Sequence, residues 1–487
     1  MAEQREHEES LDPQNWEELK ALGHRMVDDM MDYLSTVRDR PTWQPVSDQA
    51  RDALQQPVPR KPQGAERTYH DFLNSVLPFP MGNVHPRFWG WVIGTGTASA
   101  ALAEMLAATM NPNVGGGDHV ANDVEAQVIA WCKELMGFPM EASGLLTSGG
   151  SMANLVGLTV ARNARLDVDV REQGLQGSSQ RWMVYGSTQM HSSIQKAVEL
   201  LGLGHASLRE IPADDDFRID VGQLERAIED DRAAGHRPFC LVGNAGTVNT
   251  GAFDDLDRLA DIATREDLWF HVDGAFGAWA RLSDQLQGLT RGMERADSLA
   301  FDLHKWMYVN YEAGCTLVRD EEAHRRAFSL TPDYLEHAER GLAAGHLWFS
   351  DYGVQLSRGF RGLKIWMSFK EHGLDKYARL IQQNADQAHY LAELVDETPE
   401  LERMAPVPLN IVCFRYTSDG LDTDALNRLN REILMELHEQ GIAVPSYTML
   451  DGAYVLRVAI TNHRSRREDF DLLVREVVRL GDERRDG

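Results

Sequence analysis

The chain has 487 residues, of which 25% are charged and 43% are hydrophobic. This composition is typical of a globular protein and excludes disordered and fibrous folds. The 49 basic and 75 acidic residues give a formal net charge of −26, which argues against nucleic acid or an anionic membrane as the main partner.

Residues 1–10 are polar, and no stretch contains the roughly 18 apolar residues that a membrane span needs. The four cysteines are scattered without a C-x-x-C pair, which predicts reduced thiols rather than disulfides. The histidines include no pair with the spacing of a zinc site, so the sequence predicts no metal. We therefore expect a cytoplasmic protein that does not bind membranes.

Residues 1–85 are predicted to form an N-terminal helical arm. Asp12 and Pro13 are typical of the first positions of a helix, and apolar residues then recur at helical spacing over 16–37. The prolines of 41–62 predict an extended segment after this helix. The apolar face of the helix must be buried on its own subunit or on a second one, and the residues alone do not decide between the two.

Residues 86–380 alternate short β-like runs with longer amphipathic ones, which indicates a large α/β domain with a mainly parallel sheet covered on both faces. The predicted strands are 182–185, 239–243, 268–273, 298–301 and 315–318, and the clearest helices are 221–234 and 256–266. Residues 381–487 predict a smaller α+β domain. Its predicted helices are 381–398 and 423–440, and its predicted strands are 409–416 and 454–459.

Four polar motifs follow predicted strands or open predicted helices, where ligands of open α/β sheets bind. The glycine-rich turn Thr147–Asn154 leads into a helix, and such a turn binds phosphate through its backbone N–H groups. Asp273 ends a very apolar strand, Lys305 follows the strand 298–301, and His191 opens a helix. Each motif alone also has a purely structural explanation, such as a helix cap or a buried polar residue.

Together the four motifs fit pyridoxal 5'-phosphate, an aldehyde cofactor with a phosphate and a ring nitrogen. Gly150 and Ser151 would hold the phosphate, and Lys305 would condense with the aldehyde, because a lysine at a strand end is a natural imine-forming nucleophile. Asp273 would pair with the ring N–H and keep the ring protonated as an electron sink. The sequence therefore predicts an enzyme that uses this cofactor.

Over nearly its whole length the chain resembles the group II pyridoxal-phosphate-dependent amino acid decarboxylases, the family of aromatic-L-amino-acid, histidine and glutamate decarboxylases. The matching segments are His85–Phe88, Ser148–Asn154, His191–Ser193, Gly246–Thr247 with Ala252–Asp254, His271–Asp273, His304–Trp306, Pro332–Leu335 and Arg358–Lys364. The resemblance implies a fold-type I α/β homodimer with a mainly parallel, seven-stranded sheet and an active site at the subunit interface. It also implies that the N-terminal arm packs on the partner subunit.

The resemblance implies roles for individual residues as well. It assigns cofactor binding to Gly150, Ser151, His191, Thr247, Asp273, Ala275, Asp302 and Lys305. His191 would stack on the cofactor ring opposite Ala275, and His304 would line the substrate side. Tyr334 would lie on a catalytic loop at about 324–346 and give a proton to the substrate carbon after CO2 leaves, and the glycines near the end of this segment suit a closing loop.

The residues that the resemblance places in the substrate pocket are Phe88, Trp89, Trp91, Tyr311, Ser357 and Arg358. Because four of them are aromatic, we expect an L-amino acid with an aromatic or heteroaromatic side chain to be converted to the amine and CO2. An acidic substrate, namely glutamate, aspartate or sulfinoalanine, is the alternative. Against it, the glutamate branch of the family has polar residues where this chain has Trp89-Gly90-Trp91. An aldehyde synthase on the same fold is a third alternative, but Tyr334 and His191, whose replacement accompanies that activity, are both present.

Three positions near the pocket bear on the substrate. Val248 follows Thr247 where relatives often carry a second threonine, so one hydroxyl contact is lost. Residues 111–118 read N-P-N-V-G-G-G-D and lack the bulky aromatic residues of the aromatic-substrate subgroup, which predicts a wider or more polar pocket. Ser357 stands where family members carry glycine or serine, a choice associated with substrate preference.

Overall fold

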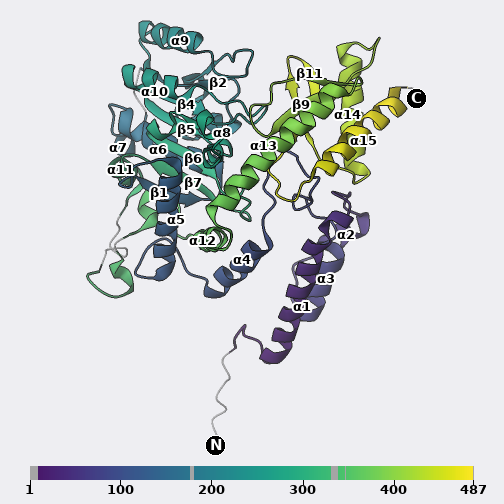
Figure 1. Cartoon of the computed structure of the whole chain (residues 1–487). Helices are drawn as coiled ribbons and strands as arrows, with labels where there is room; N and C mark the ends of the chain where they lie inside the picture. Colours follow the sequence, from purple (N-terminus) through teal and green to yellow (C-terminus); the bar gives the residue numbers. More distant parts are fainter. Residues whose placement is uncertain (1–8, 176–179, 331–337, 346, 486–487) are drawn as a thin grey trace, which may run out of the picture.

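The computed structural model describes residues 9–175, 180–330, 338–345 and 347–485. It contains a seven-stranded sheet and a separate four-stranded sheet, and the N-terminal helices lie next to the smaller one (Figure 1). Within these ranges no helix combines the length and the apolar character that a membrane crossing requires. All four cysteines are buried and free.

The large sheet has the strand order β1-β7-β6-β5-β4-β2-β3. Its strands are β1 (Ser143–Thr147), β2 (Trp182–Ser187), β3 (Leu208–Ile211), β4 (Arg237–Asn244), β5 (Trp269–Asp273), β6 (Ser298–Asp302) and β7 (Gly314–Val318). Among these described strands only β7 runs antiparallel to its neighbours, so the predicted mainly parallel, seven-stranded sheet is confirmed. All five predicted strands are present, with small shifts at their ends.

Helices cover both faces of the large sheet. One face carries α6 (Gly150–Arg165), α8 (Ser192–Leu200) and α11 (Glu321–Phe328), and the other carries α5 (Val120–Met136), α9 (Val221–Ala233) and α10 (Leu256–Arg265). The predicted helices 221–234 and 256–266 correspond to α9 and α10. Next to α5, α12 (Arg361–His372) packs against α4 (Ala98–Met110).

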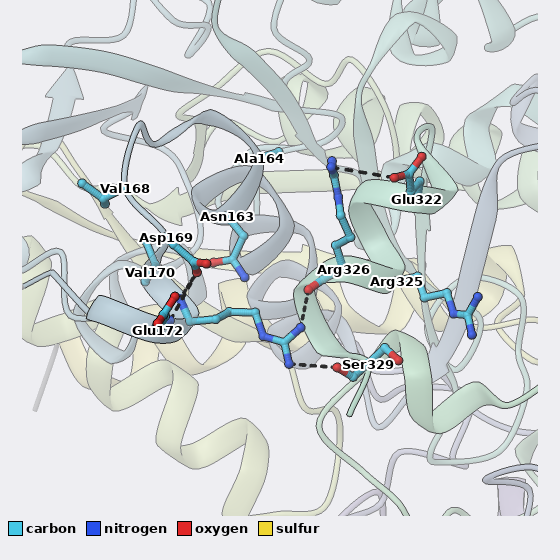
Figure 2. A pocket seen from close by; sticks show the side chains of 11 residues that line it. Asn163, Ala164, Val168, Asp169, Val170, Glu172, Glu322, Arg325, Arg326 and Ser329 are labelled. Atoms are coloured by element: carbon cyan, nitrogen blue, oxygen red, sulfur yellow. Dashed lines mark hydrogen bonds and ion pairs between the residues drawn. The ribbon is translucent and has the colours of Figure 1, made fainter. Parts of the chain in front are cut away.

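A recess of about 910 Å³ lies between α11 and the short helix α7 (Val170–Gln173) (Figure 2). The guanidinium of Arg171 donates to the carbonyl oxygens of Arg326 and Ser329, at 2.6 and 2.8 Å. These bonds satisfy carbonyl groups at the end of α11 that the helix itself leaves open. None of the predicted site residues lines this recess. The hydrogen bonds of Arg171 hold one end of α11 in place.

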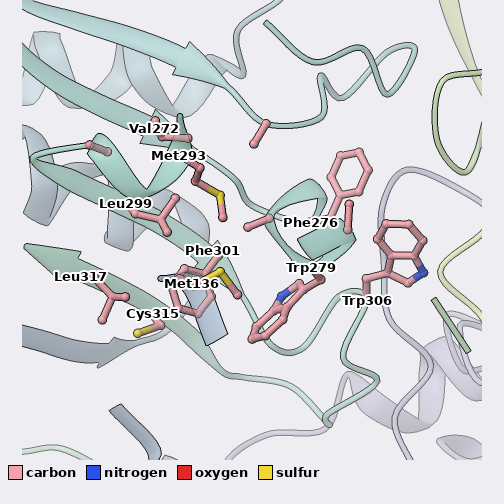
Figure 3. Packing of buried hydrophobic residues seen from close by; sticks show 14 of the residues in the cluster. Met136, Val272, Phe276, Trp279, Met293, Leu299, Phe301, Trp306, Cys315 and Leu317 are labelled. Carbon is pink, nitrogen blue, oxygen red and sulfur yellow. The ribbon is translucent and has the colours of Figure 1, made fainter. Parts of the chain in front are cut away.

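Side chains alternate along β5 and β6, which separates an apolar core from a polar face. Val272, Leu299 and Phe301 belong to the core, together with Trp279 and Met293 (Figure 3). The polar residues that alternate with these apolar ones lie toward α6, namely His271, Asp273, Ser298 and Asp302. Polar side chains therefore gather between the sheet and α6.

The smaller sheet is antiparallel throughout its described strands and has the order β10-β11-β9-β8. Its strands are β8 (Leu401–Arg403), β9 (Ile411–Tyr416), β10 (Ser446–Leu450) and β11 (Ala453–Ala459), and its helices are α13 (Leu374–Glu397), α14 (Thr423–Glu439) and α15 (Arg467–Arg485). All the predicted elements of this region are present. α13 begins earlier than predicted, directly after Gly373, whose φ of +70° ends the preceding helix.

The N-terminal arm differs from the prediction in two places. α1 (Trp16–Ser35) begins after Asn15 rather than at Pro13, because the Asn15 side chain accepts hydrogen bonds from two N–H groups of the first turn. The segment predicted to be extended contains α2 (Asp48–Leu54), and α3 (Ala65–Ser75) follows it. Both helices fit between the prolines, which exclude helix only at and just before their own positions.

Candidate active site

Three strands of the large sheet end at one edge, beside a cavity of about 270 Å³. β1, β5 and β6 are parallel to one another, because β1 and β6 both pair antiparallel with β7. The structure brings nine of the predicted site residues to this cavity, namely Gly150, Ser151, His191, Asp273, Ala275, Asp302, His304, Lys305 and Tyr311.

The turn between β1 and α6 forms one wall of the cavity. α6 begins at Gly150, and no described side chain caps its first turn, so N–H groups at the positive end of the helix are available to an anion. A Cβ atom at Gly150 would lie 2.8 Å from Asp302 Oδ2, and one at Gly314 would lie 2.6 Å from the Cα atom of Gly149. Glycine is therefore required for the turn to lie this close to β6 and β7.

Lys305 lies three residues after β6, and its ammonium is 2.9 Å from the carboxylate of Asp302. Asp302 is only 1% exposed, and its Oδ1 atom has no hydrogen-bond partner among the described residues. Trp306 anchors the segment, because its buried indole donates to Asn384 Oδ1 at 3.0 Å. The amine is thus held at the cavity wall by a buried carboxylate.

Asp273 is buried at the end of β5 and faces the same cavity. Its Oδ1 atom accepts the N–H of Ala275 at 3.1 Å, and its Oδ2 atom accepts the side-chain amide of Asn154 at 2.9 Å. Both donors are neutral, so they do not compensate the charge of the carboxylate. This buried carboxylate favours a cationic N–H partner, such as a protonated pyridine ring.

Two histidines complete the walls. His191 is the N-cap of α8, and its Nδ1 atom accepts the N–H of Ser193 at 3.2 Å. The Nδ1 atom of His304 accepts the N–H of Ala313 at 3.0 Å, and its ring lies against the ring of Tyr311 with the centroids 4.2 Å apart. Desolvation lowers the pKa of both histidines, which favours neutral rings whose single proton is on Nε2.

These groups fit pyridoxal phosphate. The first turn of α6 would hold the phosphate, Asp273 the ring nitrogen and Lys305 the aldehyde, while His191 and Ala275 would contact the ring. When bound, this cofactor supplies an electron sink for negative charge on the substrate carbon. The lone uncompensated carboxylate and the anion-binding helix end match the two charged ends of the cofactor.

Two predicted site residues have a structural role instead. Thr247 is buried, and its hydroxyl accepts the N–H of Ala252 at 3.1 Å within its own loop, so it does not line the cavity. Arg358 is buried in an ion pair with Glu125 and donates to the carbonyl oxygens of Val114 and Leu146. The prediction that these two residues contact cofactor and substrate is therefore not supported by where their polar atoms lie.

The predicted aromatic pocket is only partly assembled at the cavity. Trp89 lies in the core of the smaller sheet, stacked on Phe470, and does not line this cavity. Phe88 and Trp91 contact each other, with centroids 6.3 Å apart, but neither lines the cavity, and Ser357 is an exposed residue outside it. Tyr311 is the one predicted aromatic pocket residue that lines the described cavity.

The predicted catalytic loop begins later than expected. His324 is buried within α11, where its Nδ1 atom lies 2.8 Å from the Ser143 hydroxyl, so the loop cannot start there. Tyr334 lies outside the described residues.

The sequence interpretation also missed residues that line the cavity. Asn154 and Ser193 are only parts of longer motifs in the sequence, yet Asn154 contacts Asp273 and Ser193 contacts His191. A signal for Asn154 was available, since Gly150, Asn154 and Gly157 lie at i, i+4 and i+7 of one helix and thus share the face that starts at the phosphate turn.

Comparison with known proteins agrees with this site. Residues 48–417 match the family model of the pyridoxal-dependent decarboxylase conserved domain. The chain is 34% identical to the aromatic-L-amino-acid decarboxylase of Bacillus atrophaeus over 96% of both proteins. It is 27% identical to tryptophan decarboxylase 2 of Oryza sativa subsp. japonica over 93% of this chain and 92% of that protein.

A solved structure shows the same fold. The structure of Oryza sativa TDC with PLP and tryptamine has a TM-score of 0.89 at 26% identity, and the match covers 97% of this chain and 99% of that one. The predicted resemblance is confirmed, and the chain belongs to the pyridoxal-dependent decarboxylases, enzymes that use pyridoxal phosphate to remove the carboxyl group of amino acids.

Proposed function

We propose that this enzyme decarboxylates an aromatic or heteroaromatic L-amino acid to the amine and CO2. The observation on which the reaction rests is the single cavity in which Lys305, Asp273 and the first turn of α6 meet. The aromatic substrate is supported by the similarity to the Bacillus atrophaeus and rice decarboxylases and by the exposed ring of Tyr311 at the cavity.

Each side chain has a defined task in this proposal. Lys305 provides the amine that binds the cofactor aldehyde, and Asp273 holds a proton on the ring nitrogen. His191 contacts the cofactor ring and orients it. Tyr334, whose position the structure does not describe, donates the proton that replaces the departing carboxyl group, as its match to the family pattern implies.

The surroundings of Tyr311 favour an aromatic over an acidic side chain. Tyr311 is 48% exposed and also borders a second cavity of about 300 Å³. The basic groups of that cavity already face carboxylates: Arg361 lies 2.7 Å from Glu312, and Lys364 pairs with Glu104. Because these cations are compensated within the protein, they are poor partners for a substrate carboxylate.

A substrate screen tests the proposal. We expect the enzyme loaded with pyridoxal phosphate to release CO2 with the highest kcat/KM from tryptophan, tyrosine, phenylalanine or their ring analogues. Glutamate, aspartate and sulfinoalanine serve as the comparison. A higher kcat/KM for any of these three acids would contradict the aromatic substrate and support the acidic alternative.

The proposal includes a homodimer in which the arm packs on the partner subunit and the active site lies at the interface. Apolar side chains are exposed on α1 and α4, where Trp16 is 62% exposed and Leu102, Met105 and Leu106 are also exposed. Contiguous apolar groups on a helix surface indicate a protein contact. A cytoplasmic location is also proposed, on the basis of the four free cysteines.

A further inference from the structure

A chain of hydrogen bonds lies behind the active-site cavity, between α6 and the strands β5 and β6. It runs from Trp269 through Ser298 and His271 to Asn154. There it divides, because the amide nitrogen of Asn154 reaches both Asp273 and the hydroxyl of Ser193, which in turn contacts His191. The chain thus connects the carboxylate proposed to hold the cofactor ring with the histidine proposed to contact it.

The direction of these bonds follows from their outer end. The indole of Trp269 can only donate, and it donates to Ser298 Oγ at 2.8 Å. The Ser298 hydroxyl then directs its own hydrogen to His271 Nδ1, 2.7 Å away. Burial lowers the pKa of His271 to about 4, so its ring is neutral near pH 7 and carries its single proton on Nε2.

That proton fixes the orientation of Asn154. His271 Nε2 lies 2.9 Å from Asn154 Oδ1, so the amide oxygen must face His271 and the NH2 group must face the cavity. Its two hydrogens go to Asp273 Oδ2 at 2.9 Å and to Ser193 Oγ at 3.0 Å. The Ser193 hydroxyl then donates to His191 Nδ1 at 2.8 Å, which leaves the His191 proton on Nε2.

The fold brings α6 unusually close to the sheet at this network. A Cβ atom at Gly157 would lie 2.8 Å from His271 Cε1 and 3.2 Å from Ser298 Oγ, so only glycine allows the contact. Asn154, His271 and Ser298 are all buried, so water does not replace a missing donor or acceptor at no cost.

We propose that Asn154 is a positioning residue for decarboxylation. His271 holds Asn154 in one orientation, and Asn154 in turn fixes both the position of the Asp273 carboxylate and the location of the His191 proton on Nε2. The proposal rests on the function proposed above, because it acts through Asp273 and His191. A purely structural Asn154 would only satisfy buried polar groups, and its loss would change stability without changing how the cofactor is bound.

Asn154→Leu tests the proposal, because leucine has a similar size and neither donates nor accepts hydrogen bonds. We expect the visible absorption and circular dichroism of the bound cofactor to shift, and the Kd for pyridoxal phosphate to rise about tenfold. We also expect kcat to fall about tenfold or more while KM changes less, because Asn154 acts through Asp273 and His191. Thr159→Val is the matched control on α6, since among the described residues the Thr159 hydroxyl bonds to the carbonyl oxygen of Leu155 and to no member of the network.

Ser298→Ala tests the orienting role of His271 without altering the cavity wall. Loss of this hydroxyl allows the His271 proton to move to Nδ1. The side-chain amide of Asn154 can then rotate so that its NH2 group faces His271. We expect the same spectral shift as in Asn154→Leu, but a smaller one. If Ser298→Ala causes no spectral shift, the proposed role of His271 is overturned.

Wild-type spectra, Kd and kcat in a folded Asn154→Leu would overturn the whole proposal. Failure of the proposed function is distinguishable from this result. In that case the wild type prefers glutamate, aspartate or sulfinoalanine, or Asp273→Ala keeps full activity, whereas the absorption and Kd of Asn154→Leu can still be measured. A double variant of Asn154→Leu with Asp273→Ala should also lose less than the product of the two single losses, because both changes act through one carboxylate.

Discussion

In the proposed function, Asp273 is the residue on which the cofactor chemistry depends most. The described residues that donate to its carboxylate are neutral, so its charge is available to hold the ring proton. We expect Asp273→Ala to lower kcat by roughly a hundredfold or more, because the electron sink acts on the transition state rather than on substrate binding. Steady-state kinetics with saturating pyridoxal phosphate measure this effect, with the exposed Asp284→Ala as control. A variant with near-wild-type kcat would refute the role of Asp273.

Tyr334 decides which product is formed, according to the proposed function. Tyr334→Phe keeps the ring and removes only the phenolic proton that is needed after CO2 leaves. We expect normal binding of cofactor and substrate, a large loss of amine, and some diversion to aldehyde, ammonia and peroxide. Separate measurement of amine and aldehyde in one incubation checks this. Undiminished amine would mean that another group donates the proton.

Single residues also show which parts of the candidate site could be predicted from the sequence. The meeting of Asp273 and Lys305 at one edge of the sheet could be predicted, because Asp273 ends one apolar strand, Lys305 follows another, and the carboxyl ends of parallel strands meet at one edge. The buried surroundings of Thr247, Trp89 and Arg358 could not be predicted, because a family motif fixes the position of a residue in the chain but not the direction of its side chain. Arg358 instead pairs with Glu125, far from it in sequence, and no local pattern reveals that partner.

At the scale of elements, deletion of α1 tests the proposed dimer. It contacts α3 through a hydrogen bond of Tyr69 to Asp29, at 2.7 Å, yet leaves Trp16 exposed. We expect deletion of residues 1–40 to weaken the dimer and lower activity, because the apolar face of α1 would cover the partner subunit. Sedimentation and kcat are the measurements. An unchanged dimer with full activity would show that α1 folds back on its own subunit.

Elements were predicted well where their pattern is long and apolar. Most of β4 and all of β5 are buried on both faces and therefore form continuous apolar runs in the sequence, and α9 and α10 have a clear helical period. α2 was missed because it has only 7 residues between prolines, and its stability depends on the Ser47 cap rather than on an apolar face.

For the whole molecule, buried histidines predict sensitivity to mild acid. Burial lowers the pKa of His271 to about 4 and that of His324 to about 3, from an ordinary value of 6.5. As the pH falls below 6.5, these two histidines therefore bind protons in the unfolded chain but not in the folded one, which favours unfolding. Each of them lowers the free energy of unfolding by about 1.4 kcal/mol at pH 5.5. We expect Tm to fall between pH 7.5 and 5.5, with or without added cofactor. A flat Tm over this range would contradict neutral, buried histidines.

The order of the strands and the joining of both sheets into one body required the structure, because they depend on contacts between residues far apart in the chain. The seven-stranded sheet was predicted from the family resemblance, whereas periodicity alone indicated only a mainly parallel sheet. The network behind the cavity was not predicted, since it links α6, β5 and β6 through side chains whose partners are set by packing.

The proposed function depends above all on Lys305 binding the cofactor aldehyde in the cavity at the ends of β1, β5 and β6. Borohydride reduction of the enzyme loaded with pyridoxal phosphate, followed by peptide mass spectrometry, tests this most directly. We predict that the reduced cofactor is attached to Lys305 and that Lys305→Ala is inactive but folded. Stable attachment to any other lysine, with Lys305 unmodified, would contradict the account.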